Sequence, residues 1–169
     1  MMSSTDVYNA CNSIKNWSVT ASFSVGGFEW LAFSKESRGK MIVISSQRTT
    51  VVDCNTGTVE DCGIVFDEKE LLAYCDRLPD EELHIAGQYG GRLPLVSAKG
   101  ESVVVRTNDA HMMKIHFVSG LFQRKLIYDC YDAYVCGFSC DGDYFVLADD
   151  SGILIMRRTD RDASSGTEQ

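Results

Sequence analysis

Aspartates and aromatic residues alternate in the last third of the chain, between residues 126 and 156. This stretch has no lysine or arginine, and its aromatic residues include Tyr128 and Tyr144. Carboxylates steer a basic molecule over long range, and exposed tyrosines supply strongly binding contact area. The pattern therefore predicts a docking face for a basic protein. Its predicted binding residues are Asp129, Tyr131, Asp132, Tyr134, Asp141, Asp143, Asp149 and Asp150.

A structural explanation of the same aspartates stays open beside the functional one. Asp141 precedes Gly142, and Asp150 lies two residues before Gly152. Aspartate accepts hydrogen bonds from its own backbone in turns, and glycine adopts positive φ without a clash. Each aspartate therefore also fits a role in turn geometry and solubility. A second acidic segment, Asp53 to Glu82, has ten acids and two bases and is the next candidate for a docking face.

The sequence contains no recognisable catalytic motif. It lacks the G-x-S-x-G, H-E-x-x-H, Walker and G-x-G-x-x-G patterns. Of three histidines, His84 and His116 lie inside strand-like runs, and His111 lies in a polar loop. We therefore predict a protein that is not an enzyme and has no cofactor.

The chain has seven cysteines, an odd number, and several of them lie next to apolar or aromatic residues. That pattern favours reduced, mostly buried cysteines in a cytoplasmic protein over a disulfide framework. Structural zinc sites use closely paired Cys or His residues, and Cys136 and Cys140 alone do not make such a set. Asp141 and Asp143 do not have the spacing of an EF-hand loop. The predicted metal content is none.

The bulk composition excludes several partner classes. The formal net charge is −8 and the pI is near 4.8, which disfavours nucleic-acid binding. No apolar run approaches 18 residues, so no membrane span is expected. The start of the chain lacks a basic and an apolar signal region, so we predict a cytoplasmic protein.

Three segments predict β-hairpins at a regular step. Turn glycines at Gly39, Gly91 and Gly142 lie 52 and 51 residues apart, and each is followed by two apolar runs separated by a turn. The runs are Met41–Ile44 with Thr49–Val52, Leu93–Val96 with Val103–Val105, and Tyr144–Ala148 with Ile153–Met156. Repetition at such a period is typical of repeat β architectures.

The last repeat resembles a blade of a WD-repeat propeller. Phe138-Ser139-Cys140-Asp141-Gly142, followed by Asp150-Ser151-Gly152, is similar to the middle of such a blade. The Gly-His and Trp-Asp dipeptides of that family are absent, and a closed propeller needs about four blades or more. The resemblance therefore implies hairpin geometry, and no functional residue is transferred from it.

The predicted fold is mainly β, with three antiparallel hairpin repeats; a β-trefoil or prism is the alternative. Strands are also expected at Val19–Val25, Phe28–Phe33, Leu83–Ala86, Met113–Val118, Leu126–Tyr128 and Tyr134–Phe138. Ser4 or Thr5 is expected to cap a short first helix with Val7, Cys11 and Ile14 on one face. Acids after Asp67 and a leucine stripe predict a second helix over Asp67–Leu78.

These features predict one β-rich domain over residues 1–160 and a flexible tail over 161–169. In size, acidity and lack of catalytic residues the chain is similar to immunity proteins, which block the active site of a bacterial toxin. That resemblance implies an inhibitor of a basic partner such as a toxin nuclease. The alternative is a self-assembling scaffold subunit, in which a homodimer completes a ring of repeats.

Overall fold

The computed structural model describes residues 1–121, 123–131 and 133–159. Asp132 and the predicted tail over residues 161–169 lie outside the described residues. Within the described part, one helix precedes fifteen strands. They are α1 (Ser4–Asn12), β1 (Trp17–Phe23), β2 (Phe28–Phe33), β3 (Lys40–Ser45), β4 (Thr49–Asp53), β5 (Val59–Asp61), β6 (Ile64–Asp67), β7 (Leu72–Cys75), β8 (Leu78–His84), β9 (Ala86–Gly87), β10 (Ser102–Thr107), β11 (Met112–Ser119), β12 (Gln123–Tyr131), β13 (Val135–Phe138), β14 (Tyr144–Asp149) and β15 (Gly152–Arg158).

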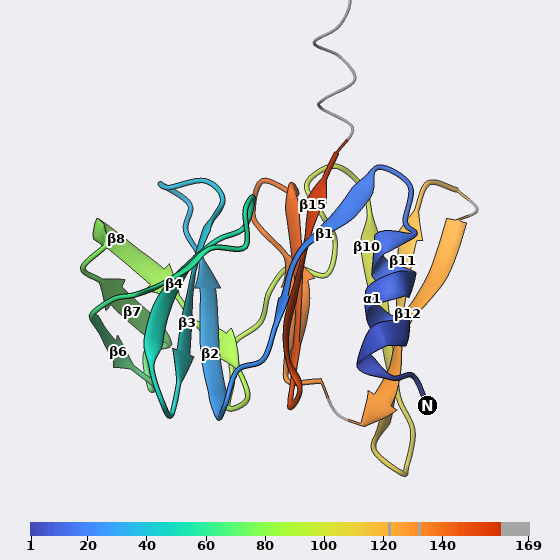
Figure 1. Cartoon of the computed structure of the whole chain (residues 1–169), viewed down its shortest axis with the longest axis horizontal. Coiled ribbons are helices and arrows are strands. Elements are labelled where there is room, and N and C mark those ends of the chain that lie inside the picture. Colours follow the sequence, from blue (N-terminus) through green and yellow to red (C-terminus); the bar gives the residue numbers. More distant parts are fainter. Residues whose placement is uncertain (122, 132, 160–169) are drawn as a thin grey trace, which may run out of the picture.

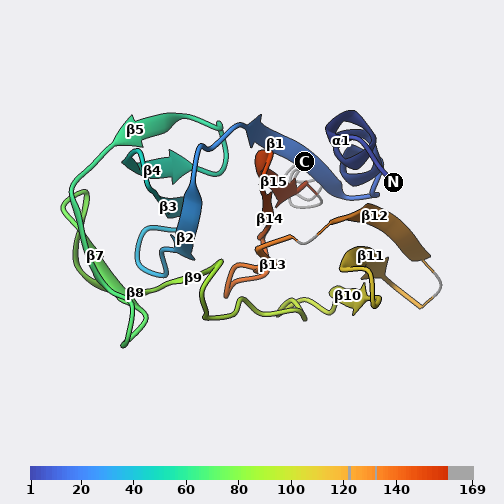
Figure 2. The ribbon, with the colours of Figure 1, turned by 90° about the horizontal axis from the view of Figure 1, so that it is seen from below.

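The strands form four antiparallel sheets that lie face to face in a row (Figures 1 and 2). From one end of the row to the other, the sheets are β6-β7-β8, then β5-β4-β3-β2-β9, then β1-β15-β14-β13, then β10-β11-β12. The prediction of a mainly β, antiparallel fold is confirmed. The number of units differs, because the structure has four sheets where the sequence predicted three hairpin repeats.

The two ends of the described chain meet in one sheet. Strand β1 pairs antiparallel with β15, with Trp17 opposite Arg158 and Phe23 opposite Ile153. The register shifts between Val19 and Ala21, and the Thr20 hydroxyl donates to the carbonyl of Cys54 at 2.7 Å. The pairing joins residues about 140 positions apart, and it seats α1 against the neighbouring sheet β10-β11-β12 (Figure 1).

Strand alternation divides the buried side chains into three cores, one between each pair of sheets. On β14, Phe145 and Leu147 pack toward β10-β11-β12, whereas Val146 and Ala148 pack toward the sheet that contains β3. Successive side chains of a strand point to opposite faces, so both faces of this sheet are buried. The third core lies between β2-β3-β4 and β7-β8 and includes Trp30.

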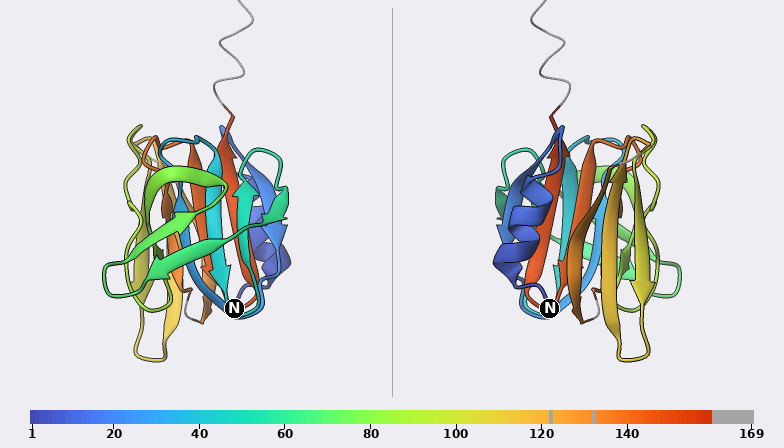
Figure 3. Two further views of the ribbon diagram at one scale, coloured as in Figure 1. Left: turned by 90° about the vertical axis from the view of Figure 1, so that its left-hand side faces the viewer. Right: turned by 90° about the vertical axis from the view of Figure 1, so that its right-hand side faces the viewer.

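The two sheets at the ends of the row bury only one face each. On β11, Ile115 and Phe117 point into the core, and Lys114, just before Ile115, is exposed. On β7, Ala73 is buried and its neighbour Tyr74 is 49% exposed. Figure 3 shows the outer faces of these sheets from the two ends of the molecule.

The first helix is confirmed, with its cap one residue earlier than expected. Ser3 is the N-cap: its hydroxyl accepts from the backbone of Asp6, and the Asp6 side chain accepts from the Ser3 backbone. This reciprocal arrangement is a capping box. Val7 and Cys11 are buried in the core that includes β10-β11-β12, as is Ile14 just after the helix, so the predicted face is confirmed.

The predicted helix over Asp67–Leu78 is wrong; this segment forms strands of the sheet β6-β7-β8. The Asp67 side chain accepts from the backbone of Lys69 and Glu70, and Leu71 has φ 56°. The acids that were interpreted as a helix start therefore make a hairpin turn. The leucines that would share one face of a helix lie instead in the turn and in strands β7 and β8. Tertiary packing against β2-β3-β4 outweighs the helical spacing of these residues.

The second predicted hairpin is also wrong in its first half. Residues 93–96 belong to no sheet and make one bridge, between Val96 and Ser102. The carbonyl of Pro94 accepts instead from the backbone of Phe138 at 2.8 Å. Proline lacks the N–H that a ladder strand requires. This segment runs along the edge of β13 and connects β9, in the second sheet of the row, with β10 in the last sheet. The remaining predicted strands are present, except that Leu83–Ala86 is divided between the end of β8 and the start of β9.

All seven cysteines are free thiols. Cys11, Cys54 and Cys75 are buried, Cys140 is exposed, and the other three are half-buried. Among the described residues, no helix has the length and hydropathy needed to cross a membrane.

Candidate functional site

Four aspartates of the predicted docking face lie at the two ends of strand β14. Asp141 and Asp143 lie in the turn before β14, and Asp149 and Asp150 lie in the turn after it. A six-residue strand at about 3.3 Å per residue keeps the two groups roughly 20 Å apart. They therefore do not form one surface.

At the first end, the aspartates have basic partners from distant segments. The Arg38 guanidinium lies 3.0 Å from Asp141 and also contacts Asp143, which pairs with Lys99 as well. Asp143 is only 3% exposed. The expectation that Asp143 presents its carboxylate to a partner is not met, because the fold surrounds it with cations that are remote in sequence.

A buried ion pair lies beside this group. Arg158 contacts Glu101, donating to its Oε1 at 2.6 Å, and the guanidinium lies 4.7 Å from the ring centroid of Trp17. Trp17 Nε1 donates to Glu101 at 3.3 Å, and the Ser97 hydroxyl donates to it at 2.7 Å. This network ties β1, β15 and the start of β10 together, so its role is structural.

Asp129 lies on a third surface. Its carboxylate is 3.8 Å from Lys114, its neighbour across the β11–β12 ladder, on the outer face of that sheet. Surface pairs of this kind contribute little stability. Asp129 is therefore partly neutralised and points away from the other predicted binding residues.

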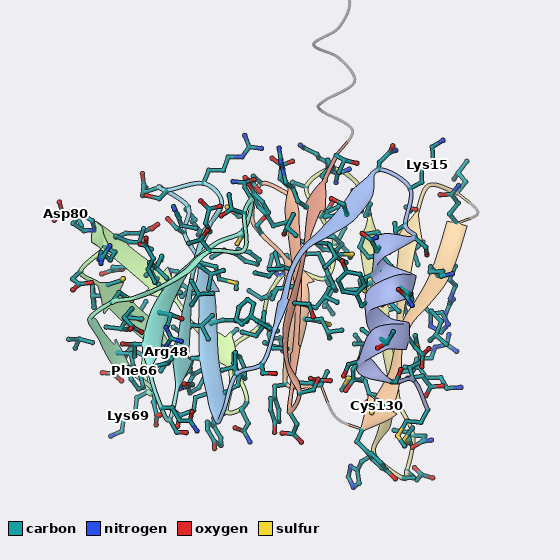
Figure 4. The ribbon with its side chains drawn as sticks, in the orientation of Figure 1. Lys15, Arg48, Phe66, Lys69, Asp80 and Cys130 are labelled. Atoms are coloured by element: carbon teal, nitrogen blue, oxygen red, sulfur yellow. The ribbon has the colours of Figure 1, made fainter. Side chains whose placement is uncertain are left out.

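The remaining predicted residues meet in a cleft of about 720 Å³ at the second end of β14. Tyr131, Tyr134, Asp149 and Asp150 all line it. The cleft is also lined by the first residues of α1, the end of β1 and the β12 residues Tyr128 and Cys130; Figure 4 labels Cys130 at this end of the molecule. We call this feature the tyrosine–aspartate cleft. Its described lining contains no lysine, arginine or histidine.

Hydrogen bonds hold the two carboxylates of the cleft in place. Asp149 Oδ1 accepts from the backbone and hydroxyl of Ser151 at 2.8 and 2.6 Å, and its Oδ2 accepts from the Tyr128 hydroxyl at 3.1 Å. The Tyr134 hydroxyl donates to Asp150. Asp150 and Tyr131 are exposed, so a ligand can reach them.

The tyrosines stay protonated in this setting. Burial, followed by the charge of Asp149, raises the pKa of Tyr128 far above its usual value. The hydrogen bond to Asp150, with some desolvation, raises the pKa of Tyr134 to about 12. The Tyr134 ring also stacks on Phe28, with centroids 6.0 Å apart and planes at 10°. The cleft therefore combines two carboxylates with fixed neutral aromatic rings.

This chemistry fits a cationic side chain. An ammonium or guanidinium group is attracted to carboxylates and to the faces of tyrosine rings. Besides its carboxylates and tyrosines, the described lining offers the thiol of Cys130 and several serine hydroxyls, and it contains no histidine to act as their base. The described residues that bring metal-ligating atoms together are Cys62, Cys75 and Asp76, in another part of the molecule.

Sequence reasoning missed the N-terminal part of the cleft. Met2, Val7, Phe23 and Ser24 line it, more than 100 residues away from Tyr128 in the chain. Only the pairing of β1 with β15 brings them there, and no local pattern marks it. No protein-family model, curated protein or solved structure matches the chain.

Proposed function

We propose that the chain is a non-catalytic protein-binding domain whose tyrosine–aspartate cleft receives a lysine or arginine side chain of a basic protein. The observation that carries the proposal is the cleft lining: Asp149, Asp150 and three tyrosines, without a described base. The acidic charge of the whole chain, −8, adds long-range attraction to such a partner. The most concrete form is an immunity-type inhibitor of a toxin nuclease, whose active site is basic because its substrate is anionic.

The proposed binding site has fewer residues than the set that the sequence indicated. Tyr131, Tyr134, Asp149 and Asp150 form the binding site, and Tyr128 supports it from below. Asp150 and Tyr131 are the contact residues, since both are exposed. Asp149 and Tyr128 hold the wall of the cleft through their mutual hydrogen bond.

A peptide titration tests this proposal. The isotope-labelled protein is titrated with a short peptide that has two arginines between glycines, and backbone amide shifts are followed by NMR. We expect the shifts to gather at residues 128–134 and 149–152 and to weaken with salt, because screening shortens the field. The D150N and Y131A variants should each weaken the peptide about tenfold, which corresponds to about 1.4 kcal/mol.

The matched control is D141N, because Asp141 lies at the other end of β14, in the turn that follows β13. It should bind the peptide as the wild type does. A peptide with glutamate in place of arginine should produce no localised shifts. Shifts around Asp141, or binding that is indifferent to D150N and Y131A, would contradict the proposal.

The structure also supports a second candidate function, self-assembly through the outer faces of the end sheets. On the outer face of β10-β11-β12, Arg106 is paired opposite Lys114, and the Arg124 guanidinium lies 3.5 Å from the ring of His116. The outer face of β6-β7-β8 has Glu82, which accepts from the Tyr74 hydroxyl at 3.1 Å, with Val65 paired opposite Tyr74. Arg106 and Arg124 on one face and Glu82 on the other therefore have opposite charge.

Contact between these faces would be head-to-tail. Two copies could close into a ring by making the contact twice, whereas unclosed contacts would extend into a filament. In such a ring the four sheets of each copy would follow one another, and the blade-like hairpins would belong to one continuous propeller-like array. This arrangement corresponds to the self-assembling scaffold subunit that the sequence left open as the alternative function.

A charge-reversal mixture tests self-assembly. The R106E/R124E variant disrupts one face and the E70K/E82K variant disrupts the other; all four residues are exposed. Light scattering after size exclusion at low salt should show association of the wild type and monomers of each variant. A mixture of the two variants should associate again, because one pair of faces is unchanged and the reversed charges of the other pair are also opposite in sign. A wild type that stays monomeric at high concentration would exclude this function.

A further inference from the structure

Two cysteines and an aspartate converge at the edge of the sheet β6-β7-β8. Cys62 lies just before β6, Cys75 is the last residue of β7, and Asp76 follows it. Their ligand atoms, two Sγ and one carboxylate oxygen, all lie within 4.8 Å of one another. We propose that Cys62, Cys75 and Asp76 form a binding site for a thiophilic divalent cation of the zinc type, with a fourth coordination position open to solvent.

The backbone around these residues is already fixed. Ile64 pairs with Cys75 in the β6–β7 ladder, and the backbone of Asp76 donates to the carbonyl of Gly63 at 3.0 Å. The Gly63 backbone donates in return to Asp76 Oδ1 at 3.0 Å. A hydrogen bond of this kind orients a ligating carboxylate. The three ligands therefore need little rearrangement to meet one ion.

The ligand set selects the class of metal. Zinc binds thiolate at about 2.3 Å, and tetrahedral geometry then places two sulfurs about 3.8 Å apart. The observed separations exceed that spacing by no more than about 1 Å. Two thiolates and one carboxylate favour zinc or cadmium over magnesium or calcium, which prefer oxygen ligands. Cys75 is buried and Asp76 is exposed, so the open position faces the solvent.

Metal uptake must release protons. The ion replaces one proton on each of Cys62 and Cys75, both protons pass to solvent, and the bound group has two metal–sulfur bonds and one metal–oxygen bond. Affinity should therefore rise steeply with pH. The alternative to metal binding is that the Cys62 and Cys75 side chains serve only to pack the hydrophobic core that contains Ile64 and Phe66.

Cobalt titration separates these explanations. The reduced, full-length protein is titrated with Co²⁺, which reports thiolate ligation through a charge-transfer band in the near ultraviolet. We expect the band at one equivalent, its displacement by zinc, and an increase of several degrees in the melting temperature with zinc. The C62S and C75S variants should abolish the band, and D76N should weaken cobalt binding about tenfold or more.

The matched control is C140S, which removes the exposed cysteine and should leave the band unchanged. Alkylation followed by mass spectrometry gives a readout that does not depend on the variants folding. Zinc should slow modification of Cys62 and Cys75 in the wild type and leave Cys140 reactive. A wild type without the band, a band that survives C62S, or thiols that zinc does not protect would overturn the proposal.

Discussion

Tyr128 and Asp149 join the last two sheets of the row through a hydrogen bond of 3.1 Å from the Tyr128 hydroxyl to Asp149 Oδ2. The same hydroxyl lies 2.6 Å from the carbonyl of Tyr131. Tyr128 comes from β12 and Asp149 from the end of β14, so this contact forms a wall of the tyrosine–aspartate cleft. The cleft therefore depends on how these two sheets are held together.

Removing the Tyr128 hydroxyl should loosen that wall. We expect Y128F to lower the free energy of unfolding by about 1–3 kcal/mol, because the buried hydroxyl bonds to a charged carboxylate. Urea denaturation measures the change. The Y134F variant is the control, since its hydroxyl contacts the exposed Asp150, and it should cost less. Equal losses in the two variants would show that the Tyr128 bond does not support the wall.

The Glu101 network should make stability depend on acid pH. Burial alone would raise the pKa of the Glu101 carboxyl, but hydrogen bonds from Arg158 and Ser97 outweigh it and hold the pKa below its usual value. A depressed pKa in the folded state stabilises the protein above about pH 4.3, and this stability is lost as pH falls through the folded-state pKa. Wild-type unfolding free energy should fall over that window.

The E101Q variant should show a shallower dependence on pH below about 4.3, because it has no proton to bind at this position. The variant should also be less stable at neutral pH, since Arg158 loses its buried counterion. The E82Q variant, changed at an exposed glutamate, is the control and should keep the wild-type slope. Identical slopes for wild type and E101Q would contradict the assignment.

The hairpin turn at Leu71 predicts an unusual response to glycine. Leu71 has φ 56°, a conformation that costs a residue with a Cβ roughly 1–2 kcal/mol and that glycine adopts freely. The strain relieved in L71G should nearly offset the packing lost from a half-buried leucine. Unfolding free energy should therefore change by less than about 1 kcal/mol. A loss well above that value would favour the helix that the sequence indicated.

The thiols should react at very different rates. Cys140 is exposed, whereas burial raises the pKa of both the Cys11 and Cys54 thiols to about 12. A thiol reacts as its thiolate, so titration of the native protein with a chromogenic disulfide should give one rapid equivalent. The C140S variant should lose it, and denaturation should expose all seven. Rapid reaction of Cys11 or Cys54 would show that the core opens readily.

Local patterns were sufficient for most of the strands and for the first helix. The β2, β3, β4, β14 and β15 strands follow from runs of β-branched and aromatic residues between turn residues. The same approach failed at Asp67–Leu78. Acidic residues in a turn, followed by regularly spaced leucines, have the same sequence pattern as a capped helix, and only packing against the neighbouring sheet distinguishes the two. The approach also failed at residues 93–96, where Pro94 cannot join a ladder from both sides.

The sequence by itself determined the residues of the candidate site and the charge that attracts a basic partner: Tyr131, Tyr134, Asp149 and Asp150 are close in the chain and carry their own chemistry. Tertiary structure decided which aspartates can act together. Asp141 and Asp143 are separated from Asp149 by the length of β14 and lie against Arg38. Charges interact through space, so their partners depend on contacts between distant segments. The pairing of β1 with β15 likewise completes the cleft with residues that no local pattern could place there.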